Sequence, residues 1–201
     1  MARARPRCQL RETVRETAPT GHLVAVEGWC YKSSVSAEHH KAHSPRSVRV
    51  FVLTISDSRT EDSDTSGKLA MELLHAAGHT LAGYRLVKDE PIEVAALVRG
   101  IAADGLADVV VSSGGTGVSR RDSTYEAIDS LLDKRLDGFG ELFRMLSYQE
   151  IGSAAMLSRA VGGLHEGVVV FALPGSSNAV RLGMEKLILP ELGHLVFEKA
   201  R

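Results

Sequence analysis

From residue 48 onward the chain alternates apolar runs with amphipathic stretches, and this alternation limits its fold more than any other feature of the sequence. Residues 48–55 are almost continuously apolar, which is typical of a strand covered on both faces. Residues 67–77 follow with leucines and alanines at helical spacing on one face, and Gly78 is expected to end this helix. The repeated β-α order predicts a three-layer α/β/α sandwich around a mainly parallel sheet.

The same reasoning places the remaining elements. Strands are expected at residues 81–87, 108–112 and 167–173, and helices at 91–103, within 140–160 and up to about 189. Ser123 and Glu126 have the spacing of a capping box, which predicts a helix start there. Open α/β sheets bind ligands at the carboxyl ends of their strands. We therefore expect a site in the loops after Ile55, Val87, Ser112 and Leu173.

Residues 1–46 are polar and lack periodicity, so we interpret them as a disordered extension ahead of one domain at 47–201. Three clustered histidines, His39, His40 and His43, lack a fourth ligand and are interpreted as part of this solvated tail. The two cysteines, Cys8 and Cys30, lack the CxxC spacing of a zinc or redox site.

Charge and hydropathy narrow the class of protein further. Hydrophobic residues make up 44% and charged residues 24% of the chain, as in soluble globular proteins. No apolar stretch has the length of a membrane span or a signal peptide, which favours a cytoplasmic protein. The net charge of −1 offers no bulk attraction to nucleic acid, so anion binding would have to be local.

The most informative loop comprises Ser112, Ser113, Gly114, Gly115, Thr116 and Gly117. Small residues between a strand and a helix let a phosphate approach the main chain, where successive N–H groups can hold it. The alternative is a simple turn whose glycines permit positive φ. The loop lacks the lysine motif of a P-loop, and residues 56–60 lack the glycines of a dinucleotide fold.

A second strand-to-helix turn contains Pro174, Gly175, Ser176 and Ser177 and is another candidate anion site. The alternative here is a helix N-cap by Ser176 or Ser177. No Gly-x-Ser-x-Gly motif and no cysteine of the domain supports covalent hydrolase chemistry.

Acidic residues recur near the expected strand ends, at Asp57, Asp89 and Asp122. Carboxylates beside a phosphate site suggest Mg²⁺, which needs few protein ligands when phosphates supply others. Capping or turn roles are the alternative for each aspartate. The scattered histidines are interpreted as structural or solvated, and these are His75, His79, His165 and His194.

From about Val35 the chain resembles the MoaB/MogA family of molybdenum cofactor biosynthesis proteins, and specifically its MoaB branch. The matching motifs are LTISD (53–57), DTSG (64–67), SGGTG (113–117), RDSTYEA (121–127), GFGELFR (138–144), EIG (150–152), SRA (158–160) and PGS (174–176). The resemblance implies a molybdopterin-binding α/β/α domain. Its active members transfer AMP from Mg-ATP to the terminal phosphate of molybdopterin and release pyrophosphate.

The resemblance also implies roles for particular residues. Asp89 and Asp122 match the two functional aspartates of the family, to which we assign catalysis and Mg²⁺ positioning. Contacts with ATP and molybdopterin are expected from Ser56, Asp57, Asp64, Gly67, Ser112, Ser113, Gly114, Gly115, Thr116, Gly117, Arg121, Thr124, Pro174, Gly175, Ser176 and Ser177. Because the Arg-Asp-x-Thr stretch is retained, an active adenylyltransferase is expected.

Two other functions stay open at this point, a non-catalytic molybdopterin-binding or carrier protein and a regulatory module for another phosphorylated metabolite. The family pattern implies a homo-oligomer, trimer or hexamer, and contacts with other enzymes of molybdenum cofactor biosynthesis. It does not require the first 34 residues, which a wrongly assigned start codon would explain and which we expect to be dispensable. A protein beginning at Val35 that failed to fold would refute that expectation.

Overall fold

The computed structural model describes residues 44–119 and 122–200. The strands are β1 (Arg49–Ile55), β2 (Thr80–Val87), β3 (Val109–Ser113), β4 (Lys134–Arg135), β5 (Val161–His165) and β6 (Val168–Leu173). The helices are α2 (Thr65–Ala76), α3 (Pro91–Ala103), α4 (Thr124–Leu131), α5 (Asp137–Ile151), α6 (Ser177–Gly183) and α7 (Leu189–Lys199). A 3-10 turn, η1 (Gly152–Leu157), follows α5, and a π-helical turn, η2 (Met184–Ile188), joins α6 to α7.

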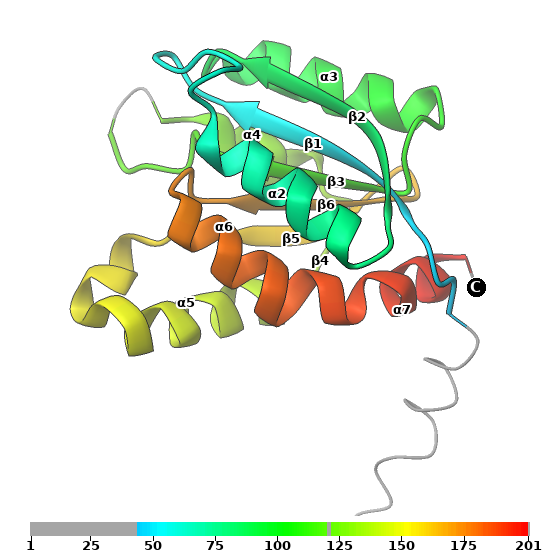
Figure 1. Ribbon diagram of the computed structural model, residues 1–201. Coiled ribbons are helices and arrows are strands. Elements are labelled where there is room, and N and C mark those ends of the chain that lie inside the picture. Colours follow the sequence, from blue (N-terminus) through cyan, green and yellow to red (C-terminus); the bar gives the residue numbers. More distant parts are fainter. Residues whose placement is uncertain (1–43, 120–121, 201) are drawn as a thin grey trace, which may run out of the picture. The chain divides into compact units, whose positions relative to one another are not determined.

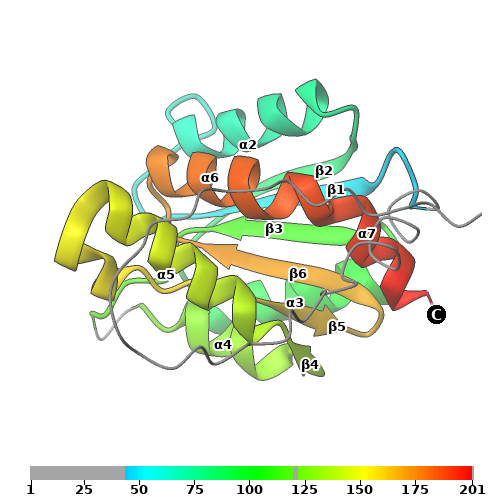
Figure 2. The same cartoon turned by 90° about the horizontal axis from the view of Figure 1, so that it is seen from below.

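The strands form one six-stranded sheet in the order β2-β1-β3-β6-β5-β4. The four strands β2, β1, β3 and β6 are parallel, whereas β5 and β4 are antiparallel to their neighbours. Helices α2, α5, α6 and α7 cover one face of the sheet and α3 and α4 the other (Figures 1 and 2). The predicted three-layer α/β/α fold with a mainly parallel sheet is therefore confirmed.

The alternation of side chains along each strand divides the core into two clusters. In β1, Val50 and Val52 pack toward α2 and α7, whereas Phe51 and Leu53 pack toward α3. Both clusters are buried, which explains why the residues of β1 read as a continuous apolar run.

The structure differs from the predicted elements in several places. Strands β4 and β5 were not expected, and the expected capping box is wrong because the Ser123 side chain makes no cap hydrogen bond to α4. The last helix does not end at Leu189 but continues to Lys199. The N–H of Leu189 donates to the carbonyl of Met184, and this wide turn accommodates Pro190, which has no N–H for a regular helix bond.

The predicted helix at residues 67–77 begins earlier than expected. The buried Asp64 side chain accepts a hydrogen bond from the Gly67 N–H at 3.0 Å and caps α2, which starts at Thr65. The predicted N-terminal extension lies mostly outside the described residues.

Candidate active site

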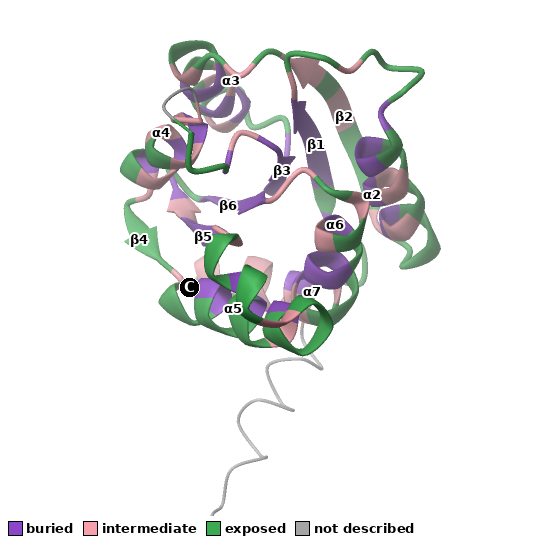
Figure 3. Cartoon of the chain, turned by 90° about the vertical axis from the view of Figure 1, so that its left-hand side faces the viewer, coloured by how far each residue is buried: buried purple, intermediate pink, exposed green. Residues whose placement is uncertain are grey.

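The carboxyl ends of β1, β3 and β6 meet at one edge of the sheet, which Figure 3 shows from the front. The register brings Thr54 of β1 beside Ser113 of β3, and Ser113 beside Leu173 of β6. The first N–H after β3, that of Gly114, donates to the Leu173 carbonyl at 3.0 Å. The two loops that the sequence singled out, after β3 and after β6, are therefore neighbours.

The glycine-rich loop fits between these strands because two of its residues have no side chain. Gly114 and Gly115 have φ of 105° and 64°, values that favour glycine. A Cβ on Gly114 would lie 2.0 Å from the carbonyl oxygen of Ile55. The main chain of the loop therefore packs directly on the end of β1.

Asp89 lies against this loop although it follows a different strand. A Cβ on Gly115 would be 2.9 Å from Asp89 Oδ1 and 2.7 Å from Thr124 Cβ. Thr124, the first residue of α4, donates its hydroxyl hydrogen bond to Asp89 Oδ1. The Asp89 N–H in turn donates to Asp57 Oδ1 at 3.2 Å. The structure thus brings three predicted site residues, Asp57, Asp89 and Thr124, to the same loop.

Asp122 lies at the other end of the glycine-rich loop. A Cβ on Gly117 would be 2.3 Å from Asp122 Oδ2, and the Ser119 N–H donates to that oxygen at 3.0 Å. Both predicted catalytic aspartates are therefore packed against the main chain of residues 115–119. Arg121, the neighbouring predicted residue, lies outside the described residues.

The loop after β6 packs on the glycine-rich loop from the side of α6. A Cβ on Gly175 would lie 3.1 Å from Gly114 Cα. The Ser176 hydroxyl accepts a hydrogen bond from the Ala179 N–H at 3.2 Å and so forms the N-cap of α6. The Ser177 hydroxyl lies 3.1 Å from that of Thr65 at the start of α2. The N-cap alternative is thus the observed geometry for Ser176.

Arg59, in the loop after β1, contacts the start of α2 and the loop after β6, and sequence reasoning missed it. Its guanidinium donates to the Gly175 carbonyl at 2.9 Å, to the Ser66 hydroxyl and, at 3.4 Å, to Asp64 Oδ1. Arg59 lies three residues beyond Ser56, whose hydroxyl accepts the Arg59 N–H at 3.2 Å. An arginine in the short loop after an expected strand end was the available signal.

Asp64 is fully buried, so it contributes to the site only indirectly. Burial opposes its ionisation, but hydrogen bonds from Gly67 N–H and from the hydroxyls of Tyr84 and Ser66 outweigh burial and hold its pKa below the usual value. The hydrogen bond between Tyr84 and Asp64 has the opposite effect on the pKa of the Tyr84 phenol. Burial and the Asp64 carboxylate raise the pKa of Tyr84 to about 12.

Seven predicted contact residues are buried, namely Asp64, Gly67, Ser112, Ser113, Gly114, Thr116 and Thr124. Ser112 is buried and its hydroxyl donates to the Phe171 carbonyl at 3.0 Å. Gly67 lies in α2, where a Cβ would come 2.1 Å from Asp64 Oδ2. These contacts explain the residue types at Ser112 and Gly67 by packing, whereas Asp57 is exposed and Asp89 and Asp122 are half-buried.

Arg159, between η1 and β5, is the second site residue that sequence reasoning did not assign. Its guanidinium donates to the carbonyls of Thr116 at 2.8 Å, Gly117, and Asp122 at 3.2 Å. It also pairs with Glu126 and lies 4.5 Å above the centre of the Tyr125 ring. The Arg159 hydrogen bond lowers the pKa of the Glu126 carboxyl, so Glu126 serves this ion pair and not a capping box.

The carboxylates suit a cation only when a ligand supplies further oxygens. Residues 44–119 and 122–200 contain no group of three or more His, Cys, Asp or Glu side chains that could hold a metal. Asp89 and Asp122 would provide one or two oxygen ligands, which fits Mg²⁺ bound mainly through phosphates. The described histidines do not lie among these loops, and His165 is buried without a hydrogen-bond partner for either ring nitrogen.

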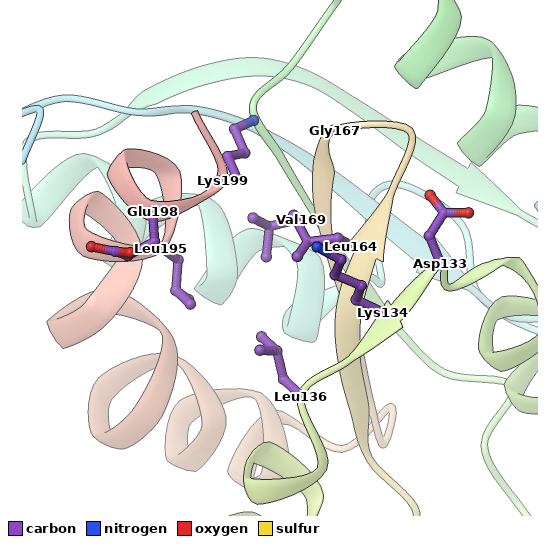
Figure 4. A pocket seen from close by; sticks show the side chains of 9 residues that line it. All are labelled: Asp133, Lys134, Leu136, Leu164, Gly167, Val169, Leu195, Glu198 and Lys199. Carbon is purple, nitrogen blue, oxygen red and sulfur yellow. The ribbon is translucent and has the colours of Figure 1, made fainter. Parts of the chain in front are cut away.

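A separate cavity of about 390 Å³ lies at the opposite end of the sheet (Figure 4). Leu136, Leu164, Val169 and Leu195 line it, with Lys134, Lys199 and Glu198 at its border. The Lys199 ammonium donates to the Asp108 carbonyl at 2.9 Å, just ahead of β3. This cavity is therefore remote from the carboxyl ends of the strands.

The structure defines an α/β/α protein with a glycine-rich loop at the carboxyl ends of its parallel strands. The comparisons with known proteins identify its family. Residues 51–194 match the family described as a probable molybdopterin binding domain. Molybdenum cofactor biosynthesis protein B from Bacillus cereus is 55% identical over 169 residues, which cover 83% of this chain and 99% of that protein. The chain belongs to this family, that of molybdenum cofactor biosynthesis protein B.

Solved structures lead to the same family. A crystal structure of a molybdenum cofactor biosynthesis protein B superposes with a TM-score of 0.76 at 55% identity, covering 78% of this chain and 98% of that one. The tungsten cofactor synthesizing protein MoaB from Pyrococcus furiosus gives a TM-score of 0.70 at 42% identity, with coverage of 78% and 99%. Within the described part of the chain, no helix is long and apolar enough to span a membrane.

Proposed function

We propose that this protein transfers AMP from Mg-ATP to the terminal phosphate of molybdopterin, giving adenylylated molybdopterin and pyrophosphate. The observation that carries the proposal is the packing of one glycine-rich loop against two carboxylates, Asp89 and Asp122, at the carboxyl ends of parallel strands. Such a site offers main-chain N–H groups to phosphates and carboxylate oxygens to a cation.

Adenylyl transfer needs alignment and charge stabilisation more than a covalent nucleophile. In this proposal the N–H groups of residues 115–117 bind phosphate oxygens, and the loop at Pro174–Ser177 borders the second phosphorylated substrate. Asp89 and Asp122 would hold Mg²⁺, which when bound would neutralise charge on the phosphates. Thr124 fixes the orientation of the Asp89 carboxylate through its hydroxyl hydrogen bond.

The roles of the other predicted residues follow from their contacts. Asp57 accepts the N–H of Asp89 and so sets the position of that aspartate. Asp64, Gly67 and Ser112 support the loops from the interior, as their buried contacts indicate. Arg59 holds the loop after β6 through the Gly175 carbonyl.

The test is an incubation of the purified protein with molybdopterin and Mg-ATP, followed by separate assays of adenylylated product and of pyrophosphate. Equal amounts of both are expected, and neither should form without Mg²⁺. Bound molybdopterin without product would instead identify a binding or carrier protein. A protein that ignored molybdopterin would point to another phosphorylated ligand.

A further inference from the structure

We infer that Arg159 is a positioning residue that holds the glycine-rich loop in its anion-binding conformation and fixes the main chain at Asp122. The inference rests on the proposed function, because it names what organises that site. Arg159 reaches the loop from the junction of η1 and β5, about forty residues away along the chain, and among the described residues of the loop it hydrogen-bonds only to main-chain carbonyls.

The three bonded carbonyls, of Thr116, Gly117 and Asp122, determine where three N–H groups point. A trans peptide directs its N–H away from its carbonyl. The N–H groups that share these peptide units belong to Gly117, Val118 and Ser123, and they point away from the guanidinium. Among the described residues none of these three N–H groups has a hydrogen-bond acceptor. These three N–H groups can therefore donate hydrogen bonds to a phosphate.

Arg159 is itself held on two sides, which makes it a rigid support. Glu126 pairs with one end of the guanidinium, and the Tyr125 ring lies 4.5 Å beneath it. Its side chain is only 23% exposed, so solvent competes little for these bonds. A planar guanidinium can bind several acceptors at fixed angles, whereas a lysine ammonium is a point charge on a flexible stem.

Two variants test the inference, Arg159→Met and Arg159→Lys, with Arg135→Lys as a matched control. Arg135 also pairs with carboxylates, those of Asp129 and Asp137, but it hydrogen-bonds to no carbonyl among the described residues of the loop. Binding of inorganic pyrophosphate is measured by calorimetry. Both Arg159 variants should bind about tenfold more weakly, or worse, because charge-assisted hydrogen bonds are lost. The control should bind as the wild type does.

Hydrogen exchange supplies a readout that does not depend on ligand or turnover. The amides of Ser119, Asp122 and Tyr125 are hydrogen-bonded within the loop, to Asp122 Oδ2, Ser119 O and Gly115 O. They should exchange several-fold faster in both Arg159 variants, while the midpoint of thermal unfolding stays within a few degrees of the wild type.

Wild-type exchange and wild-type pyrophosphate binding in Arg159→Met would overturn the inference. Wild-type behaviour of Arg159→Lys alone would also overturn it, because positive charge would then suffice without the planar fork. If Arg159→Met does not fold, the lysine variant decides the question. If the wild-type protein binds no pyrophosphate, hydrogen exchange alone decides whether Arg159 holds the loop, and the proposed function is decided separately by the assay of adenylylated product.

Discussion

At the scale of single residues, the site depends on how closely the main chain approaches two carboxylates. Gly115 combines a φ of 64° with a position where a Cβ would meet Thr124 at 2.7 Å and Asp89 at 2.9 Å. Any side chain there would have to push Asp89 out of place. The role of Arg159 could not be recognised from the sequence, because its partners in the loop are main-chain carbonyls, which every residue has.

Gly115→Ala should therefore damage both stability and turnover. We expect the free energy of unfolding to fall by about 1–3 kcal/mol from strain and crowding, and product formation to fall about a hundredfold because Asp89 is displaced. Gly100→Ala is the control, since a Cβ at Gly100 of α3 would meet nothing within 4 Å. That change should stabilise by about 0.5–1 kcal/mol. Normal turnover by Gly115→Ala would contradict the packing argument.

The hydrogen bond from the Tyr84 hydroxyl to Asp64 Oδ2, 2.7 Å long, predicts a stability effect that depends on pH. The pKa of Tyr84 is raised to about 12 by burial and by Asp64, against about 10 in the unfolded chain. The protonated phenol is favoured in the folded state, so its contribution is complete below pH 10 and is lost as the pH rises toward 12.

Tyr84→Phe should accordingly cost about 1.5–3 kcal/mol at neutral pH, the usual contribution of a hydrogen bond to a charged group. The difference from the wild type should shrink as the pH rises through this window. Urea unfolding of both proteins from pH 8 to 11.5 measures it, and other titrating groups cancel in the difference. A difference that grew with pH would show that the sign of the argument is wrong.

At the scale of helices and strands, the alternation of apolar and amphipathic stretches was enough to predict the fold class and the two loops of the site. Strand β5 was missed because Gly162 and Gly163 interrupt its apolar character, although antiparallel pairing with β6 buries it. The last helix was cut short at Pro190, because the π-helical turn that tolerates this proline has no sequence signal.

Variants of Ser176 test whether its hydroxyl caps α6 or contacts a ligand. Ser176→Ala should lower the free energy of unfolding by about 1 kcal/mol through loss of the α6 cap, and Ser176→Asn should restore it. Turnover should change less than threefold in both variants. Loss of turnover at unchanged stability in both would assign the hydroxyl to the substrate, as the sequence first suggested.

At the scale of the whole molecule, apolar side chains gather on the outer surface of α5 and η1. Six of the ten exposed large apolar residues of the described chain lie there, namely Leu142, Met145, Tyr148, Ile151, Met156 and Leu157. Soluble monomers rarely expose such a group of residues. We propose that this surface is covered in a homo-oligomer, as the family resemblance implied.

Met145→Glu should then shift the protein toward the 21.6 kDa protomer, because burying a charge in an apolar interface is costly. Sedimentation velocity compares this variant with Ile92→Glu, a change at an equally apolar residue that is 85% exposed on α3. Unchanged oligomer mass in Met145→Glu, or dissociation by Ile92→Glu alone, would place the interface elsewhere.

The sequence does not show how the predicted site residues meet in the fold. Asp89 and Thr124 are 35 residues apart, yet their side chains are hydrogen-bonded because parallel strands end at one edge of the sheet. The sequence motifs do not show that Asp64 and Ser112 are buried. A motif contains residues that support the fold as well as residues that contact a ligand. Whether the assembled site performs adenylyl transfer is the central question.

The most direct measurement compares adenylylation of molybdopterin by the wild type and by Asp122→Asn, with Asp104→Asn as a control at the exposed C-terminal end of α3. The wild type and the control should release pyrophosphate in step with product. Asp122→Asn should keep its thermal unfolding midpoint and lose about two orders of magnitude or more in turnover. Equal turnover in Asp122→Asn, or no product from the wild type, would contradict the assignment.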